Sequence, residues 1–244
     1  MLNKLLFLVE RYAAHFQGKG WGSGTVGKEF ATAVSLLEKP EATLCIDIGG
    51  NKGTYAQEIT RRFPNSKVVI FEPAKSNVEL LNQQFGANPL VTIEPLGVSS
   101  QAGSATLYSN EDGSGLASLT KRRLDHFNID FETTEKVETV VFEDYWKNQL
   151  QGQKIDVCKI DIEGHELDAL QGFGQALAHI EVIQFEFGGC NIDTRTFFQD
   201  FWYFFKKNNF ELYRITPFGP ERMTQYREID EFFLTTNYLA KRLK

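Results

Sequence analysis

The chain has 244 residues, 42% of them hydrophobic, which suffices for one sizeable α/β domain with additions or for two small domains at most. Its formal net charge is −6, which argues against a nucleic-acid partner because phosphate recognition needs clustered Lys and Arg. The three cysteines show neither metal-ligand spacing nor a disulfide framework, and the apolar stretch at residues 5–9 is too short for a signal peptide or membrane span. We therefore expect a cytoplasmic protein without a membrane partner.

Residues 1–40 contain two helical patterns, one reaching about residue 16 and the other covering about residues 26–38. The glycine-rich segment QGKGWGSG joins them. We predict that residues 1–40 form an N-terminal helical extension and that residues 41–244 form the main domain.

From residue 43 the pattern changes to alternating strands and helices. Short apolar runs predict strands at residues 44–48, 67–71 and 90–96, with helices at residues 54–63 and 74–85 between them. Alternation of this kind is typical of βαβ units, so we expect a parallel sheet covered on both faces.

Residues 109–135 interrupt this alternation because they are polar and have little periodicity. A loop of this length inside a compact domain is usually functional or mobile. We predict a flap over the functional site, with a disordered insertion as the alternative.

Regular patterns return after residue 135. We expect strands at residues 136–142, 155–162, 180–187, 210–215 and 231–236, and helices at residues 143–148, 165–171 and 195–208. In the last helix, Trp202 and Tyr203 lie off the main apolar face. They indicate either a homodimer contact or a broad buried face.

The turn after the first strand reads DIGGNKGTY (residues 47–55). It fails the G-x-G-x-x-G dinucleotide fingerprint, because Asn51 and Thr54 occupy the second and third glycine positions when counting starts at Gly49. The pattern present is D-x-G-x-x-x-G, formed by Asp47, Gly49 and Gly53. An acid at this strand end suits a ligand that carries a cationic amine.

Glu72 follows the second predicted strand, in the segment FEP. In doubly wound sheets an acid at this strand tip faces the ribose hydroxyls of a bound nucleoside. S-adenosyl-L-methionine combines an amine, a sulfonium and an adenosine ribose, and we predict it as the cofactor. The alternative for Glu72 alone is an ordinary surface acid.

Five segments together resemble, in order, the FkbM family of S-adenosylmethionine-dependent methyltransferases: DIGGNKGTY, VVIFEP, PLGVSSQAG, KIDIEGHELDALQG and IQFEF. The similarity covers about residues 43–237. It implies a Rossmann-like class I methyltransferase fold: an α/β, doubly wound, mostly parallel seven-stranded sheet of order 3-2-1-4-5-7-6, with the last strand antiparallel.

The same resemblance implies roles for individual residues. Asp47, Gly49, Asn51 and Gly53 are expected to line the methionine end of the cofactor and Glu72 to bind the ribose, while the adenine is flanked by Pro73, Val98 and Ser99. Family members typically methylate hydroxyl oxygens, often on sugars or polyketides. We therefore expect O-methylation of a small-molecule or glycan acceptor, whose identity the resemblance does not imply.

The segment KIDIEGHE (residues 159–166) ends the fourth predicted strand of the sheet. Ligands of doubly wound sheets bind outside the carboxyl ends of the strands, so we expect Asp161 beside the end of the first strand, in the cofactor site and near the methyl group. A hydroxyl acceptor also needs a base within hydrogen-bond reach. The candidates for this base are Asp161, Glu163, His165 and Glu186.

Other readings of this segment remain open. Asp161 or Glu163 could cap the following helix, and Glu166 fits an acid that complements the helix dipole. The segment HELDA lacks the second histidine of a zinc protease. We predict no resident metal, with a divalent ion held by Asp161, Glu163 and Glu186 as the alternative. The alternative to an enzyme is a non-catalytic nucleoside-binding or scaffold domain on the same fold.

Overall fold

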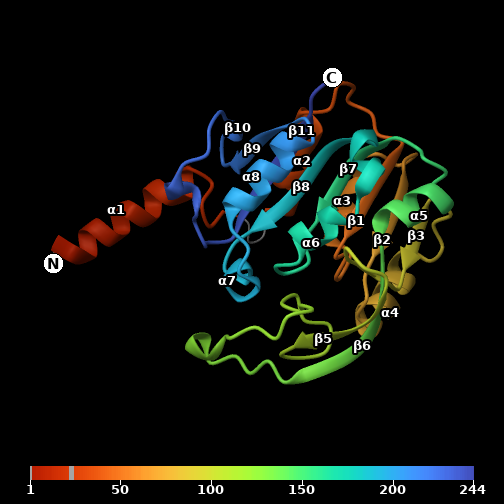
Figure 1. Ribbon diagram of the computed structural model, residues 1–244, viewed down its shortest axis with the longest axis horizontal. Helices are drawn as coiled ribbons and strands as arrows, with labels where there is room; N and C mark the ends of the chain where they lie inside the picture. The colour runs from red at the N-terminus through yellow and green to blue at the C-terminus, as the bar shows by residue number, and fades with distance from the viewer. Residues whose placement is uncertain (1, 22–24) are drawn as a thin grey trace.

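The structure is a computed structural model that describes residues 2–21 and 25–244, and its centre is an eight-stranded sheet (Figure 1). The strand order is β10-β9-β11-β8-β7-β1-β2-β3. Strands β3, β2, β1, β7 and β8 are parallel to one another, whereas β11 is antiparallel to both β8 and β9, and β10 is antiparallel to β9. The strands are β1 (Leu44–Ile48), β2 (Lys67–Phe71), β3 (Val91–Glu94), β7 (Ile155–Ile160), β8 (Ile180–Phe187), β9 (Phe210–Thr216), β10 (Gly219–Met223) and β11 (Thr236–Arg242).

Helices cover both faces of this sheet, which confirms the predicted α/β, doubly wound class. On one face, Phe30, Ile59 and Leu81 of three helices share a core, and on the other face Phe142 and Phe201 belong to a second core. Strands buried on both faces are mostly apolar, which is why they appear in the sequence as short apolar runs. The helices are α1 (Leu2–Phe16), α2 (Val26–Ser35), α3 (Thr54–Arg62), α4 (Lys75–Phe85), α5 (Phe142–Asn148), α6 (Glu166–Gln171), α7 (Cys190–Thr194) and α8 (Phe198–Lys207).

Two expectations about the end of the chain are wrong. The sheet has eight strands rather than seven, because β10 adds an edge strand beside β9. The last strand is Thr236–Arg242 and not residues 231–236. A short 3₁₀ turn, Glu228–Asp230, precedes this strand. Asp230 is fully buried, and its Oδ1 lies 3.0 Å from Nη2 of Arg214. The apolar residues that follow the turn lie in a loop.

A second sheet of three strands lies apart from the central one. It consists of β4 (Gly97–Val98), β5 (Gly103–Ser109) and β6 (Thr133–Val140), with β6 in the middle. The strand predicted at residues 136–142 therefore belongs to this sheet rather than to the central one. We call residues 103–140 the arm, which Figure 1 shows as the green segment extending beneath the carboxyl ends of the central strands.

The two N-terminal helices differ in their surroundings. Helix α2 contributes Phe30, Ala33 and Val34 to the core that it shares with α3, whereas α1 projects from the body (Figure 1). Trp202 of α8 is buried, so it does not belong to an exposed partner surface, whereas Tyr203 is 62% exposed. Within residues 2–21 and 25–244, no helix has the length and hydropathy required to cross a bilayer.

Candidate cofactor and acceptor site

A cavity that opens to solvent lies where the ends of β1, β2 and β7 face the arm. The arm supplies one wall, including Leu107, Ser114 and Leu119. Eight predicted site residues line the cavity: Gly49, Asn51, Glu72, Pro73, Val98, Asp161, Glu163 and His165.

The glycine turn presses the end of β1 against the end of β7. Gly49 has a φ of +79°, and a Cβ at this position would lie 1.9 Å from the carbonyl oxygen of Asp161. Only glycine tolerates both the left-handed backbone and this approach. Gly53 begins α3 with a φ of +80° and packs against Phe85 of α4, so its position serves helix packing rather than the cavity wall.

Glu72 joins the glycine turn to the tip of β2. Its Oε2 accepts a hydrogen bond from the backbone N–H of Asn51 at 2.8 Å, and its Oε1 accepts one from the N–H of Ala74 at 2.9 Å. Burial raises the pKa of Glu72, and these hydrogen bonds oppose that rise. The carboxylate is thus fixed at the cavity wall, with lone pairs remaining on both oxygens.

Asp47 does not line the cavity, contrary to its predicted place at the ligand. Alternation along β1 puts it on the same face as Cys45, where it is fully buried. Its Oδ1 lies 3.2 Å from Nζ of Lys159, so this chain supplies the cation that pairs with it. Its Oδ2 has no hydrogen-bond partner in the described part of the chain.

Lys159 connects the ends of β1 and β7. Its Nζ donates to Asp47 and to the carbonyl of Gly49 at 3.1 Å, and it lies 3.4 Å from Oδ2 of Asp161. Burial lowers the pKa of Lys159, but the two carboxylates more than offset this effect, and the net shift is upward. A signal for this role is present in the sequence, because a lysine inside a buried strand needs buried counter-charges.

The arm contacts the turn after β7 through three side chains. Oγ of Ser118 donates to the carbonyl of Glu163 at 2.8 Å, Oγ1 of Thr120 is 2.9 Å from Nε2 of His165, and Nη1 of Arg122 is 2.6 Å from Oε2 of Glu163. All three side chains therefore contact the same turn, between Glu163 and His165. These contacts and the cavity wall confirm that residues within the predicted flap lie over the site.

The candidate bases on this turn have shifted pKa values. Burial, reinforced by the charge of Asp161, raises the pKa of Glu163 to about 8, although Arg122 acts in the opposite direction. Burial lowers the pKa of His165, so its imidazole is neutral at pH 7. The carboxyl group of Glu163 therefore exchanges its proton near neutral pH, and the neutral imidazole of His165 can accept a proton there.

Glu166 has a structural role, in agreement with its interpretation as an acid at a helix start. It is fully buried, and its carboxylate accepts hydrogen bonds from the N–H groups of Ile162 and Gly164 at 2.9 and 3.1 Å. Burial raises its pKa to about 7. These hydrogen bonds stabilise the turn that carries Glu163. They offset the cost of its left-handed backbone, which has a φ of +54°.

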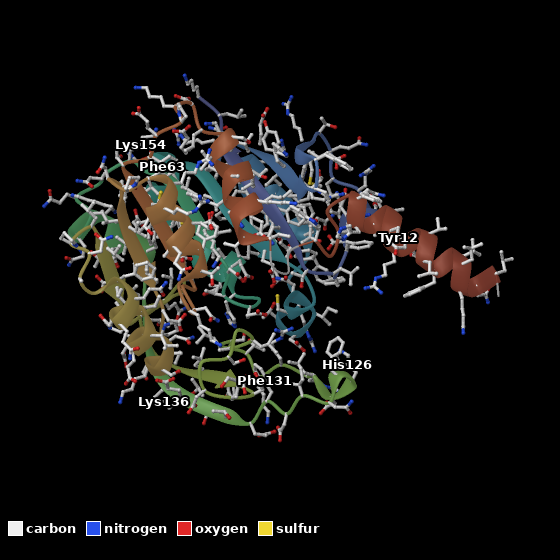
Figure 2. All side chains as sticks on the ribbon, turned by 180° about the vertical axis from the view of Figure 1, so that it is seen from behind. Tyr12, Phe63, His126, Phe131, Lys136 and Lys154 are labelled. Atoms are coloured by element: carbon white, nitrogen blue, oxygen red, sulfur yellow. The ribbon has the colours of Figure 1, made fainter. Side chains whose placement is uncertain are left out.

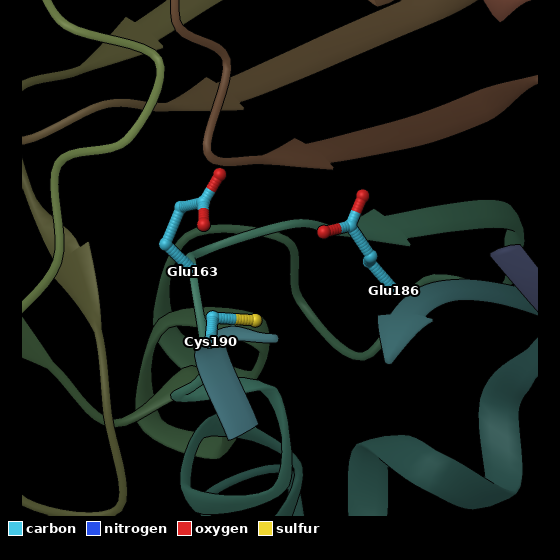
Figure 3. Close-up of side chains that lie close together, drawn as sticks. All are labelled: Glu163, Glu186 and Cys190. Carbon is cyan, nitrogen blue, oxygen red and sulfur yellow. The ribbon is translucent and has the colours of Figure 1, made fainter. Parts of the chain in front are cut away.

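Glu186 lies outside the cavity wall, next to Glu163 and Cys190. Ligand atoms of these three residues lie within 4.8 Å of one another (Figure 3). Burial, with the charges of Asp161 and Glu163, raises the pKa of Glu186 well above its usual value. This grouping differs from the alternative metal set, because Cys190 takes the place of Asp161, and Arg122 already holds one oxygen of Glu163.

Ser99 is also directed away from the cavity. Its hydroxyl donates to Oδ2 of Asp168 at 2.8 Å, and the N–H of Ser100 donates to the same oxygen at 3.0 Å. Asp168 thus ties α6 to the loop after Val98, a role that the sequence analysis missed. Of the predicted site residues, Asp47, Gly53, Ser99 and Glu186 are therefore not brought to the cavity wall as described.

Comparisons with known proteins agree with the resemblance in the motifs. The chain is 27% identical over 163 residues to the 2-O-methyltransferase NoeI of Sinorhizobium fredii (strain NBRC 101917 / NGR234), covering 63% of this chain and 66% of that protein. It is 25% identical over 174 residues to methyltransferase sdnD of Sordaria araneosa, covering 61% of this chain and 66% of that protein. The matches thus span just under two thirds of the length of these relatives.

A crystal structure of a methyltransferase FkbM from Methylobacillus flagellatus KT is similar at 13% sequence identity and a TM-score of 0.48, covering 85% of this chain and 47% of that chain. The family model described as the methyltransferase FkbM domain matches residues 47–212, which is more than half of the chain. The chain belongs to the FkbM methyltransferase family.

Proposed function

We propose that this protein is an S-adenosylmethionine-dependent methyltransferase that methylates a hydroxyl group of a small-molecule or glycan acceptor. The observation that carries this proposal is a single cavity whose wall includes the glycine turn, Glu72 and the turn from Asp161 to His165. Membership of the FkbM family supports methyl transfer. The name of the similar NoeI, a 2-O-methyltransferase, supports oxygen as the acceptor atom.

The residues of the cavity fit the predicted cofactor. Gly49 lets the ends of β1 and β7 meet at the cavity wall, and Asp161 offers a carboxylate there for a cationic amine. Glu72 offers acceptor lone pairs to a ribose diol, while Pro73 and Val98 provide apolar contacts for a base. When bound, S-adenosylmethionine would supply an electrophilic methyl group on its sulfonium.

The protein's contribution to the reaction is alignment and proton removal. Methyl transfer depends on holding the acceptor oxygen in line with the methyl group, and the arm and the Glu163 turn enclose the space for this. Glu163 is the base that we favour, because a pKa of about 8 lies near operating pH, where general-base catalysis is most effective. His165 is the second candidate, since it also lines the cavity.

A calorimetric titration with S-adenosylhomocysteine tests the cofactor site. We expect binding by the intact protein and roughly 10- to 100-fold weaker binding by Glu72→Ala, because a hydrogen bond to a charged group contributes about 1.5–3 kcal/mol. Glu79→Ala, an exposed acid on α4, is the matched control and should bind normally. No binding by the intact protein, or unchanged binding by Glu72→Ala, would refute the proposal.

A turnover screen over hydroxylated sugars and phenols, with a labelled methyl donor, tests the reaction. With an acceptor in hand, Glu163→Gln is expected to lower kcat by about 10²–10⁴-fold, the usual contribution of a general base. A comparable loss in His165→Gln with normal activity in Glu163→Gln would transfer the role to His165. Cofactor binding without turnover on any acceptor would favour the non-catalytic scaffold.

A further inference from the structure

Helix α1 exposes an unusual amount of apolar surface. Eight of its large apolar side chains are each 47–66% exposed: Leu2, Leu5, Leu6, Phe7, Leu8, Val9, Tyr12 and Phe16. Figure 1 shows the helix projecting from the body, and Figure 2 shows Tyr12 on it, far from the central sheet. An exposed apolar surface of this extent marks an interaction site.

The base of α1 is firmly attached, so the direction of the helix is defined. Gly18 follows the helix with a φ of +84°, and a Cβ there would lie 2.1 Å from the carbonyl oxygen of Ile215. Phe16 stacks on Phe218 with ring centroids 5.9 Å apart, and the carbonyl of Gln17 accepts a hydrogen bond from Arg214 at 3.5 Å. The helix therefore presents its apolar residues away from the domain in a fixed orientation.

The apolar residues of α1 follow the spacing of a helix–helix seam. Leu2, Leu5, Val9, Tyr12 and Phe16 are separated by 3, 4, 3 and 4 residues, which matches alternating a and d positions of a heptad. The opposite side of the helix carries Asn3, Lys4, Glu10 and Arg11, with Phe7 among them. A single helix of 15 residues is only marginally stable in water, so this seam calls for a partner helix.

We propose that α1 is a dimerisation helix that packs its seam against α1 of a second copy of this chain. Pairing the seams of two copies would bury five apolar side chains on each copy, which are 54–66% exposed in the single chain. The same seam on both copies gives the self-complementary contact of a two-fold dimer. A membrane surface fits less well, because Glu10 lies between the two cations of the polar side and the net charge of the chain is −6.

Light scattering coupled to size-exclusion chromatography tests this proposal on the full chain. At tens of micromolar we expect a mass of twice 27.8 kDa for the intact protein. The double variant Leu5→Asp/Val9→Asp should elute as a monomer, because it places charges in the seam. Phe7→Asp, at an equally exposed apolar residue on the opposite side, should remain a dimer.

Circular dichroism and thermal unfolding show that each variant is folded, since the changes lie outside the two cores. A monomeric intact protein overturns the proposal, and so does a dimer that persists in Leu5→Asp/Val9→Asp or is lost in Phe7→Asp. Flotation with anionic phosphatidylserine vesicles is the second arm. If the intact protein is a monomer that floats with these vesicles, and Leu5→Asp/Val9→Asp does not float, the dimer is overturned in favour of a membrane surface.

Discussion

At the scale of single residues, Lys159 is the group on which the most depends, because it balances two carboxylates at the ends of β1 and β7. We expect Lys159→Met to lower the free energy of unfolding by about 3–5 kcal/mol, because it leaves Asp47 as an unpaired buried charge. Urea unfolding followed by circular dichroism measures this change.

The double variant Asp47→Asn/Lys159→Met provides the internal control for that pair. Removing both charges should cost less than the sum of the two single changes, because the carboxylate that Lys159 compensates is then absent. Strict additivity of the two losses would contradict the pairing. Lys147→Met, which breaks an exposed pair with Glu143, should change the free energy by less than about 1 kcal/mol.

Residue positions at the cavity could be predicted where they depended only on strand ends. Glu72 and Asp161 lie at the wall because the carboxyl ends of parallel strands meet at one edge of the sheet. Asp47 could not be placed correctly, because its environment depends on Lys159, a residue 112 positions away along the chain. Arg122 escaped prediction for the same reason, since its partners Glu163 and Asp193 are distant in sequence.

At the scale of elements, the attachment of the arm to the site depends on Arg122, which pairs with Glu163 and with Asp193 of α7. We expect Arg122→Ala to increase hydrogen exchange across residues 114–124, because the arm then loses both ion pairs that join it to Glu163 and Asp193. Mass-spectrometric exchange on the full chain measures this effect.

Arg123→Ala is the matched control for the arm, because the side chain of Arg123 is exposed and only its backbone N–H contacts Asp193. Its exchange pattern should equal that of the intact protein. Equal exchange in Arg122→Ala and in the intact protein would show that other contacts hold the arm.

Elements with strong periodicity were predictable, and those set by long-range pairing were not. The apolar runs at β1, β2 and β8 gave their bounds directly, because both faces of these strands are buried. Strand β10 has an exposed, polar pattern and is a strand only because it pairs with β9. The same holds for β5, which pairs with β6 beside a long polar loop.

At the scale of the whole molecule, the sheet brings acids from several elements to one end. Asp161, Glu163 and Glu166 come from one turn and Glu186 from the end of β8. Burial, reinforced by the repulsion between these acids, raises the pKa of Glu163 and Glu186. The sequence showed these acids separately, but their crowding follows from strand order. Crowding of this kind reduces stability when the acids ionise, which makes the stability of the whole fold depend on pH.

The sign of this dependence follows from Glu163, whose pKa rises from about 4.5 in the unfolded chain to about 8 in the folded protein. Its contribution is fully present below pH 4.5 and is lost as pH rises through 8, because the folded state keeps a proton that the unfolded state has released. Glu166, with a pKa of about 7, acts in the same direction. We therefore expect Glu163→Gln, which cannot ionise, to lose less stability than the intact protein between pH 5 and pH 9.

Thermal unfolding at pH 5, 7 and 9 measures this difference. The melting temperatures of the two proteins should diverge by several degrees towards pH 9, since each kcal/mol shifts Tm by about 2–4 °C in a chain of this size. Glu79→Gln, at an exposed acid, should follow the intact protein throughout. Parallel curves for Glu163→Gln and the intact protein would mean that Glu163 is already ionised in the folded state at pH 5, held so by Arg122, and that it cannot take up a proton from an acceptor near neutral pH.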